Sequence, residues 1–283
     1  ARAIDALVAS GELVAEGPGG GDVLYLPLFY AAEVGTADRL RGLLGTPPGR
    51  MAAFRATDWD EALDWVDRRS PYALGARQRD AVRLALTEKV VVLTGGPGTG
   101  KTTTVRAVLQ LADARGLKVK LCAPTGRAAK RLAEATGKEA RTIHRLLEFN
   151  PAAGRRFARD ETNPLDVDLV VVDEVSMVDL LLMSDLARAV PPGSHLLLVG
   201  DVDQLPSVGA GNVLADLIAS GVVPTVVLDQ IFRQDAASYI VTNAHRINHG
   251  QVPLFEKDSA DFFLFPAEDA ASAEKQTRLK HLI

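Results

Sequence analysis

The 283-residue sequence contains a single cysteine, Cys122, and no apolar run that approaches the roughly 20 residues needed to span a bilayer. One cysteine excludes a disulfide and a cysteine-based metal site within this chain. Cys122 lies in the apolar run 119–123, which predicts a buried strand thiol. The N-terminus also lacks the charged-then-apolar order of a secretory signal, so we expect a cytoplasmic protein without a membrane partner.

Excess positive charge is also absent, because the net charge is −4, which on its own argues against a polyanionic partner. The distribution of charge along the chain argues for such a partner. Residues 101–160 contain fourteen basic and five acidic residues, a net charge of +9, which leaves −13 for the rest of the chain. A solvated charged face is the alternative, but such faces usually mix signs. The pattern therefore favours an electrostatic track for phosphates.

The first fifty residues predict a small separate element that ends an N-terminal helical or winged region. Apolar segments at 13–16 and 23–26 flank a glycine-rich stretch and indicate two strands, with short helices expected at 4–10 and 36–44. Such a winged-helix-like piece contacts DNA or only packs on its neighbours. Packing is favoured because the segment is not basic. Residues 45–49, Gly-Thr-Pro-Pro-Gly, indicate a linker.

From residue 58 the pattern changes to helices that alternate with apolar strands. The predicted strands are 90–94, 118–122, 168–173, 195–199 and 225–228, and the predicted helices are 58–68, 76–87, 127–135, 179–189 and 213–219. Continuous apolar strands separated by helices indicate an α/β fold with a parallel sheet covered on both faces. With 47% hydrophobic and 24% charged residues, the chain is long enough for such a core and for more than one domain.

The loop after the first of these strands has the composition of a phosphate-binding P-loop. Glycines allow backbone N–H groups to crowd around phosphate oxygens, a lysine reaches the outer phosphates, and a hydroxyl serves a magnesium ion. A following helix adds its N-terminal dipole. The predicted nucleotide-binding residues are Gly96, Pro97, Gly98, Thr99, Gly100, Lys101, Thr102 and Thr103. These features predict a RecA-like P-loop core over residues 51–230.

Two further strand ends carry polar residues suited to NTP hydrolysis. The apolar segment 169–172 ends in Asp173 and Glu174, which could hold magnesium through water and polarise the attacking water, respectively. Thr102 and Asp173 are therefore the predicted metal residues. Gln204 follows the strand at 195–199 and could sense the terminal phosphate, although an ordinary turn is the alternative.

Six ordered segments between residues 59 and 250 resemble the motifs of superfamily 1 helicases. The segment 200–209, Gly-Asp-x-x-Gln-Leu-Pro-Ser-Val-Gly, resembles motif III, and 173–177, Asp-Glu-Val-Ser-Met, has the form typical of the RecD-like (type 2 RecD) branch. The remaining matches are Gln78 to the glutamine motif, 123–132 to motif Ia, 140–147 to the DNA-contacting segment after it, and 228–234 to motif IV.

The resemblance implies an ATP- and Mg²⁺-dependent DNA helicase that moves 5′ to 3′ on single-stranded DNA in repair or recombination. It implies that Gln78 reads adenine and that Arg233 is an arginine finger, whose alternative is an exposed surface residue. The residues implied to contact DNA are Pro124, Thr125, Arg127, Lys130, Thr142, His144, Arg155 and Arg156. Taken singly, Thr125 is more often a helix cap and His144 a core residue.

Residues 148–160 interrupt the sheet pattern with turn residues between two short aromatic segments. The resemblance implies a β-hairpin pin that separates duplex at the junction of single- and double-stranded DNA, and a disordered basic loop is the alternative. After Arg233 we expect a helix at 238–249, a strand at 262–265 and a helix at 270–282, which would begin a second RecA-like domain over 231–283.

Motifs V and VI of that second domain are missing from the sequence, so we expect a fragment that binds nucleotide but hydrolyses it and unwinds DNA poorly. Other repair proteins are possible partners. A P-loop ATPase that acts as a switch or assembly module without unwinding is the main alternative. A DNA-binding module with a degenerate ATPase is a third alternative. The chain argues against it because it retains Lys101, Asp173, Glu174 and Gln204.

Overall fold

The structure is a computed structural model that describes residues 2–17, 23–151, 156–230, 238–255 and 261–263. The chain divides into two compact units. The larger unit contains residues 1–95 and 100–229, and the smaller unit contains residues 96–99 and 230–283. The main β-sheet lies entirely within the larger unit. Within the described ranges, no helix is long and apolar enough to cross a membrane.

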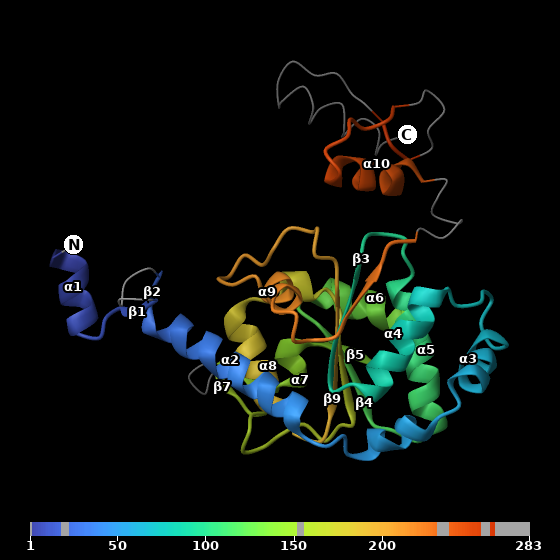
Figure 1. The fold of residues 1–283 in the computed structure, drawn as a ribbon, viewed down its shortest axis with the longest axis horizontal. Coiled ribbons are helices and arrows are strands. Elements are labelled where there is room, and N and C mark those ends of the chain that lie inside the picture. Colours follow the sequence, from blue (N-terminus) through green and yellow to red (C-terminus); the bar gives the residue numbers. More distant parts are fainter. Residues whose placement is uncertain (1, 18–22, 152–155, 231–237, 256–260, 264–283) are drawn as a thin grey trace. The chain divides into compact units, whose positions relative to one another are not determined.

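A six-stranded sheet forms the centre of the larger unit, with strand order β10-β3-β9-β8-β4-β5 and every neighbouring pair parallel (Figure 1). The strands are β3 (Val90–Gly95), β4 (Val119–Ala123), β5 (Ala140–Thr142), β8 (Leu169–Val172), β9 (His195–Gly200) and β10 (Thr225–Leu228). Parallel neighbours require crossover connections, which helices supply here. The predicted α/β fold with a parallel sheet is confirmed.

Helices cover both faces of this sheet. On one face lie α3 (Trp59–Asp67), α4 (Ala76–Thr87), α5 (Lys101–Ala114) and α6 (Gly126–Thr136), and on the other lie α2 (Pro27–Gly45), α7 (Ile143–Leu146), α8 (Leu180–Ala189) and α9 (Val213–Ala219). Polar residues mark several helix starts, because the side chains of Asp58, Thr125 and Asp179 accept N–H groups from the first turns of α3, α6 and α8.

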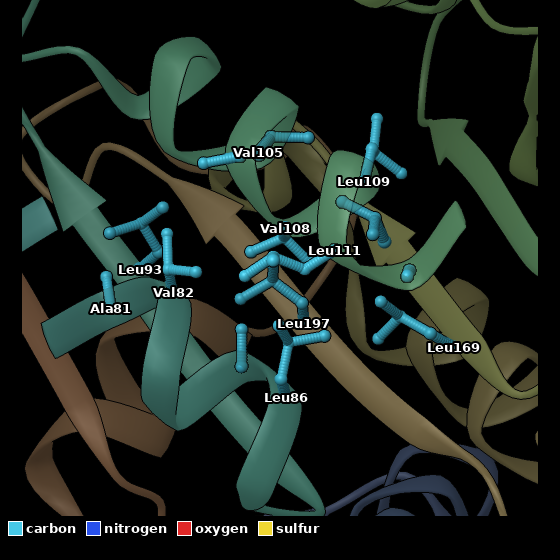
Figure 2. Close-up of a cluster of buried hydrophobic side chains, with 14 of the residues drawn as sticks. Ala81, Val82, Leu86, Leu93, Val105, Val108, Leu109, Leu111, Leu169 and Leu197 are labelled. Atoms are coloured by element: carbon cyan, nitrogen blue, oxygen red, sulfur yellow. The ribbon is translucent and has the colours of Figure 1, made fainter. Parts of the chain in front are cut away.

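The strand residues alternate between two apolar cores. In β3, Val91 and Leu93 pack into the core beneath α4 and α5, whereas Val90 and Val92 pack into the core beneath α2 and α8. Figure 2 shows Leu86 of α4 and Val108 of α5 beside Leu197 of β9 in the first core. Burial on both faces explains why the strands are continuous apolar runs in the sequence. Cys122 is buried in the second core, as predicted.

The N-terminal region consists of α1 (Arg2–Ala9), an antiparallel pair formed by β1 (Val14–Glu16) and β2 (Val23–Tyr25), and α2. The helix α2 is longer than the predicted helix at 36–44. It packs against α8, where Arg39 donates hydrogen bonds to the carbonyls of Ala187 at 3.1 Å and Val190 at 2.8 Å. A 3₁₀ helix, η1 (Arg50–Ala56), follows it. The helices α2 and η1 therefore contribute packing to the same unit as the sheet.

The smaller unit contains α10 (Tyr239–Asn248), close to the predicted helix at 238–249. The Asn243 amide group exchanges two hydrogen bonds with the backbone of Leu254, at 2.7 and 2.8 Å, and Asp261 accepts the N–H of Tyr239. The described part of the predicted strand at 262–265 is not a strand. The ring of Phe262 stacks on Phe255 instead of joining a ladder. The predicted helix at 270–282 lies outside the described residues.

Candidate nucleotide site

The ends of three neighbouring strands bring the described residues of the predicted catalytic set, Lys101, Asp173, Glu174 and Gln204, to one edge of the sheet. The strand β9 lies between β3 and β8, with Thr94 of β3 opposite Gly200 and Val172 of β8 opposite Leu198. All three strands run in the same direction, so the residues that follow them gather at one edge. In open parallel sheets this edge is where ligands bind. Its polar groups follow β3, β8 and β9.

The loop between β3 and α5 has the backbone geometry of a phosphate cradle. Gly98 and Gly100 have φ values of 74° and 85°, which favour glycine. Within the loop, the Thr99 hydroxyl donates to the Gly96 carbonyl at 2.8 Å. The helix α5 begins at Lys101, so its first N–H groups have no partner within the helix and carry the positive end of its dipole. These features suit a bound anion.

Three carboxylates act on the Lys101 ammonium group. Its Nζ donates to the Gly95 carbonyl at 2.5 Å. Burial lowers the pKa of Lys101, and the charges of Asp201, Glu174 and Asp173, the strongest first, act in the opposite direction. Burial is the larger effect, and the acidic neighbours offset part of it.

Asp201, the first residue after β9, is a site residue that sequence reasoning missed. It is 3% exposed and accepts the N–H of Asp203 at 3.1 Å. The N–H of Val202 donates to the buried Thr94 hydroxyl at 3.2 Å, which connects this turn to β3. The sequence does show that Asp201 directly follows a predicted strand. It does not show that this strand, β9, lies beside β3, and this adjacency places Asp201 near Lys101.

Asp173 and Glu174 form an acidic turn at the end of β8. The Asp173 N–H donates to the Cys122 carbonyl at 2.9 Å, and its Oδ1 accepts the N–H of Glu174 at 3.0 Å. Burial, and next the charge of Glu174, raise the pKa of Asp173 to about 6. Glu174 has a φ of 55°, a left-handed conformation that a non-glycine residue adopts only when its surroundings impose it. Such outliers are typical of functional sites.

The donor set suits magnesium that arrives with a nucleotide. Asp173 offers a carboxylate at the strand end, and Thr102 offers an exposed hydroxyl in the first turn of α5. Among the described residues, no group of three or more His, Cys, Asp or Glu side chains could hold a metal ion. Mg²⁺ normally takes one or two carboxylates together with phosphate oxygens and water rather than an all-protein cage. These residues fit that mode.

The two predicted glutamines lie in different surroundings. Gln204 is exposed, and its backbone N–H and Nε2 donate to Asp201 at 3.2 and 3.5 Å. Gln78 is buried and has both amide groups engaged. Its Oε1 accepts the Gly75 N–H at 2.9 Å, and its Nε2 donates to the Gly100 carbonyl at 3.2 Å. The Gln78 amide thus connects the start of α4 to the start of α5, a structural role that the sequence did not predict.

The predicted DNA-contacting residues divide into helix caps and surface cations. Thr125 follows β4 and Thr142 is the last residue of β5 at the same edge of the sheet, and each caps the next helix at 3.2 Å. Pro124 is half-buried, and Arg127 and Lys130 are exposed. The exposed His144 packs on aromatic rings. Arg155 and Arg233 lie outside the described residues, and of Arg156 only the backbone, in a short strand, is described.

A glycine loop between β3 and α5 and acidic turns after β8 and β9 are the features of a P-loop nucleotide-binding fold. Residues 78–210 match the family model described as "AAA domain". The chain is 44% identical over 232 residues to the ATP-dependent RecD2 DNA helicase of Deinococcus radiodurans, covering 82% of this chain and 31% of that protein. It is 50% identical over 164 residues to the RecBCD enzyme subunit RecD of Mycobacterium tuberculosis, covering 50% and 28%.

A Pif1 helicase structure from Candida albicans is 25% identical, with a TM-score of 0.48 over 64% of this chain and 45% of that one. On the sequence matches, the chain belongs to the RecD-like branch of helicase superfamily 1. It spans less than a third of the length of these two curated relatives.

Proposed function

We propose that this chain is the ATP-binding motor segment of a DNA helicase that moves 5′ to 3′ on single-stranded DNA and acts in repair or recombination. The observation that carries the proposal is the gathering of Lys101, Asp173, Glu174 and Asp201 at the strand ends beside the glycine loop. The two relatives, an ATP-dependent DNA helicase and a subunit of the RecBCD enzyme, support a DNA substrate.

The site residues perform distinct tasks in this proposal. Lys101 exchanges its hydrogen bond with the Gly95 carbonyl for the outer phosphates of ATP. Glu174, held in its left-handed conformation, orients and polarises the attacking water, and Gln204 reports whether the terminal phosphate is present. A magnesium ion, held by Thr102 and Asp173, would supply charge neutralisation at the phosphates. Gln78 borders the base, and Arg233 supplies a second cation to the phosphoryl group.

The DNA track runs across the same edge of the sheet. Thr125 lies two residues after β4, Thr142 is the last residue of β5, and Arg127 and Lys130 are exposed along α6. All four lie in the window of residues 101–160 with its net charge of +9. Single-stranded DNA is held by such positively charged grooves that follow its backbone. Pro124, His144, Arg155 and Arg156 complete the proposed contact set.

The proposal is tested by ATP turnover of the chain with and without a single-stranded oligonucleotide. We expect slow turnover that the oligonucleotide raises several-fold, and a loss on the order of 100-fold in Lys101→Ala, because the outer phosphates lose their cation. Lys120→Ala, an exposed lysine in the same basic window, is the matched control. Turnover retained by Lys101→Ala would refute the site.

A turnover indifferent to DNA would favour the switch or assembly module instead of the motor. Direction is tested separately with tailed duplexes. The weak unwinding expected of this chain should start from a 5′ tail, and unwinding only from a 3′ tail would contradict the assigned direction.

A further inference from the structure

The helices α4 and α5 pack against each other on one face of the sheet, and one buried side chain connects their N-terminal ends (Figure 1). Gln78, in the first turn of α4, donates from Nε2 to the carbonyl of Gly100, the residue directly before α5, at 3.2 Å. Its Oε1 accepts the N–H of Gly75, the residue directly before α4, at 2.9 Å. The Gln78 amide is therefore bound to backbone at both of its ends.

The Gly100 carbonyl accepts two further hydrogen bonds, both from Thr104. The Thr104 N–H donates at 3.0 Å, as in any helix, and the Thr104 hydroxyl donates to the same oxygen at 3.1 Å. Gln78 and Thr104 are 3% and 1% exposed, so neither side chain has water as a ready alternative partner. We call the Gln78 amide and the Thr104 hydroxyl on this oxygen the Gly100 clamp. Donors from two different helices thus fix the direction of one carbonyl.

The direction of this carbonyl also sets the direction of the Lys101 N–H. Both groups belong to one planar peptide unit, and in a trans peptide unit the C=O and N–H bonds point in opposite directions. This unit joins Gly100, with its left-handed φ of 85°, to the first residue of α5. The N–H groups in the first turn of a helix point out of its N-terminal end, where anions bind. Fixing the Gly100 carbonyl therefore also fixes an N–H group of the proposed phosphate cradle.

We propose that Gln78 and Thr104 are positioning residues that preform the phosphate cradle by holding the peptide unit between Gly100 and Lys101. This inference deepens the proposed ATP site and rests on it. In this role Gln78 acts on the phosphates through the backbone, whereas a glutamine that reads adenine acts on the base. A polyphosphate without a base depends only on the first role, so it separates the two.

The experiment is a calorimetric titration of the 283-residue chain and its variants with ATP and, separately, with tripolyphosphate, each in the presence of magnesium. Gln78→Met removes the amide from a side chain of similar length without adding charge. Thr104→Val removes the hydroxyl at nearly constant shape and leaves α4 unaltered, and Thr104→Ser keeps the hydroxyl.

Thr87→Val is the matched control. The Thr87 hydroxyl donates to the carbonyl four residues before it, that of Arg83, at 2.9 Å, which is the same kind of hydrogen bond at the other end of α4. Thermal unfolding verifies that each variant is folded. We expect the control and Thr104→Ser to bind both ligands as the unmodified chain does.

We expect Gln78→Met and Thr104→Val each to lower the affinity for ATP and for tripolyphosphate by the same factor, about three-fold or more, because each removes one donor from the Gly100 carbonyl. The double variant should lose less than the product of the two single losses, since both donors act on one oxygen.

A loss confined to ATP in Gln78→Met would overturn the proposal, because it would assign that side chain to the base. Unchanged affinity of folded Thr104→Val for tripolyphosphate would overturn it as well. If the unmodified chain bound neither ATP nor tripolyphosphate, the proposed nucleotide site itself would fail, which distinguishes the two failures.

Discussion

Replacing Asp173 with asparagine should stabilise the fold while it removes the proposed metal-binding carboxylate. Burial and the charge of Glu174 raise the pKa of Asp173 from 3.8 to about 6. The folded state therefore disfavours the ionised carboxylate. Asparagine has nearly the same shape and can still accept the Glu174 N–H through its Oδ1. Only the charge is removed.

The magnitude follows from the pKa difference. About two units at 1.36 kcal/mol per unit give a penalty of roughly 3 kcal/mol at neutral pH. The substitution also removes one of the three carboxylates that stabilise the Lys101 ammonium group, which offsets part of the gain. We expect Asp173→Asn to raise the free energy of unfolding by about 1–3 kcal/mol at pH 7.5.

The stability gained by Asp173→Asn should depend on pH in a defined direction. Because the folded pKa of Asp173 is raised, the penalty is fully present above about pH 6 and is lost as the pH falls toward 3.8. The gain from Asp173→Asn should therefore shrink to about a third of its value at pH 4.5. Urea unfolding at both pH values measures it, with the exposed Asp38→Asn as control. A gain that is absent at pH 7.5, or equal at both pH values, would refute this reasoning.

Three further substitutions test the packing of the larger unit. Arg39→Ala removes two hydrogen bonds to the end of α8 and should lower the free energy of unfolding, measured by urea titration, by about 1–3 kcal/mol. An unchanged free energy of unfolding would show that these hydrogen bonds do not stabilise the packing of α2 on α8. Leu43→Ala removes a side chain that is 1% exposed and should cost about 2–5 kcal/mol by the same titration. Gly211 has a φ of +101°, and a Cβ added there would lie 2.8 Å from the Cβ of Leu180. Gly211→Ala should therefore lower the melting temperature measured by circular dichroism. An unchanged melting temperature would show that the loop relaxes freely.

Much of the α/β core could be predicted from the sequence because each central strand is buried on both faces. The run from Val90 to Leu93 contains none of the polar residues that would alternate with apolar ones in a half-exposed strand. The glycine loop and the acidic turn at Asp173 were predictable for a related reason, since each directly follows such a run. Local sequence and tertiary position agree at these places.

Other elements depend on tertiary contacts that the sequence does not display. The helix α2 contains Gly35 and Gly42 and starts without a side-chain cap, so local propensity predicted only a short helix there. Packing on α8 stabilises its full length. Met51 and Phe54 follow a stretch that indicated a linker, yet both are buried in η1. Asp201 was missed because its neighbours are set by strand order rather than by sequence distance.

The most direct measurement of the central claim is a calorimetric titration of the chain and of Lys101→Ala with ATP in the presence and absence of magnesium. The account predicts one nucleotide per chain, binding that magnesium strengthens, and a loss of at least about ten-fold in affinity in the variant, because the Lys101 ammonium group is the cation at the glycine loop. Equal affinity of the two proteins for ATP would contradict it.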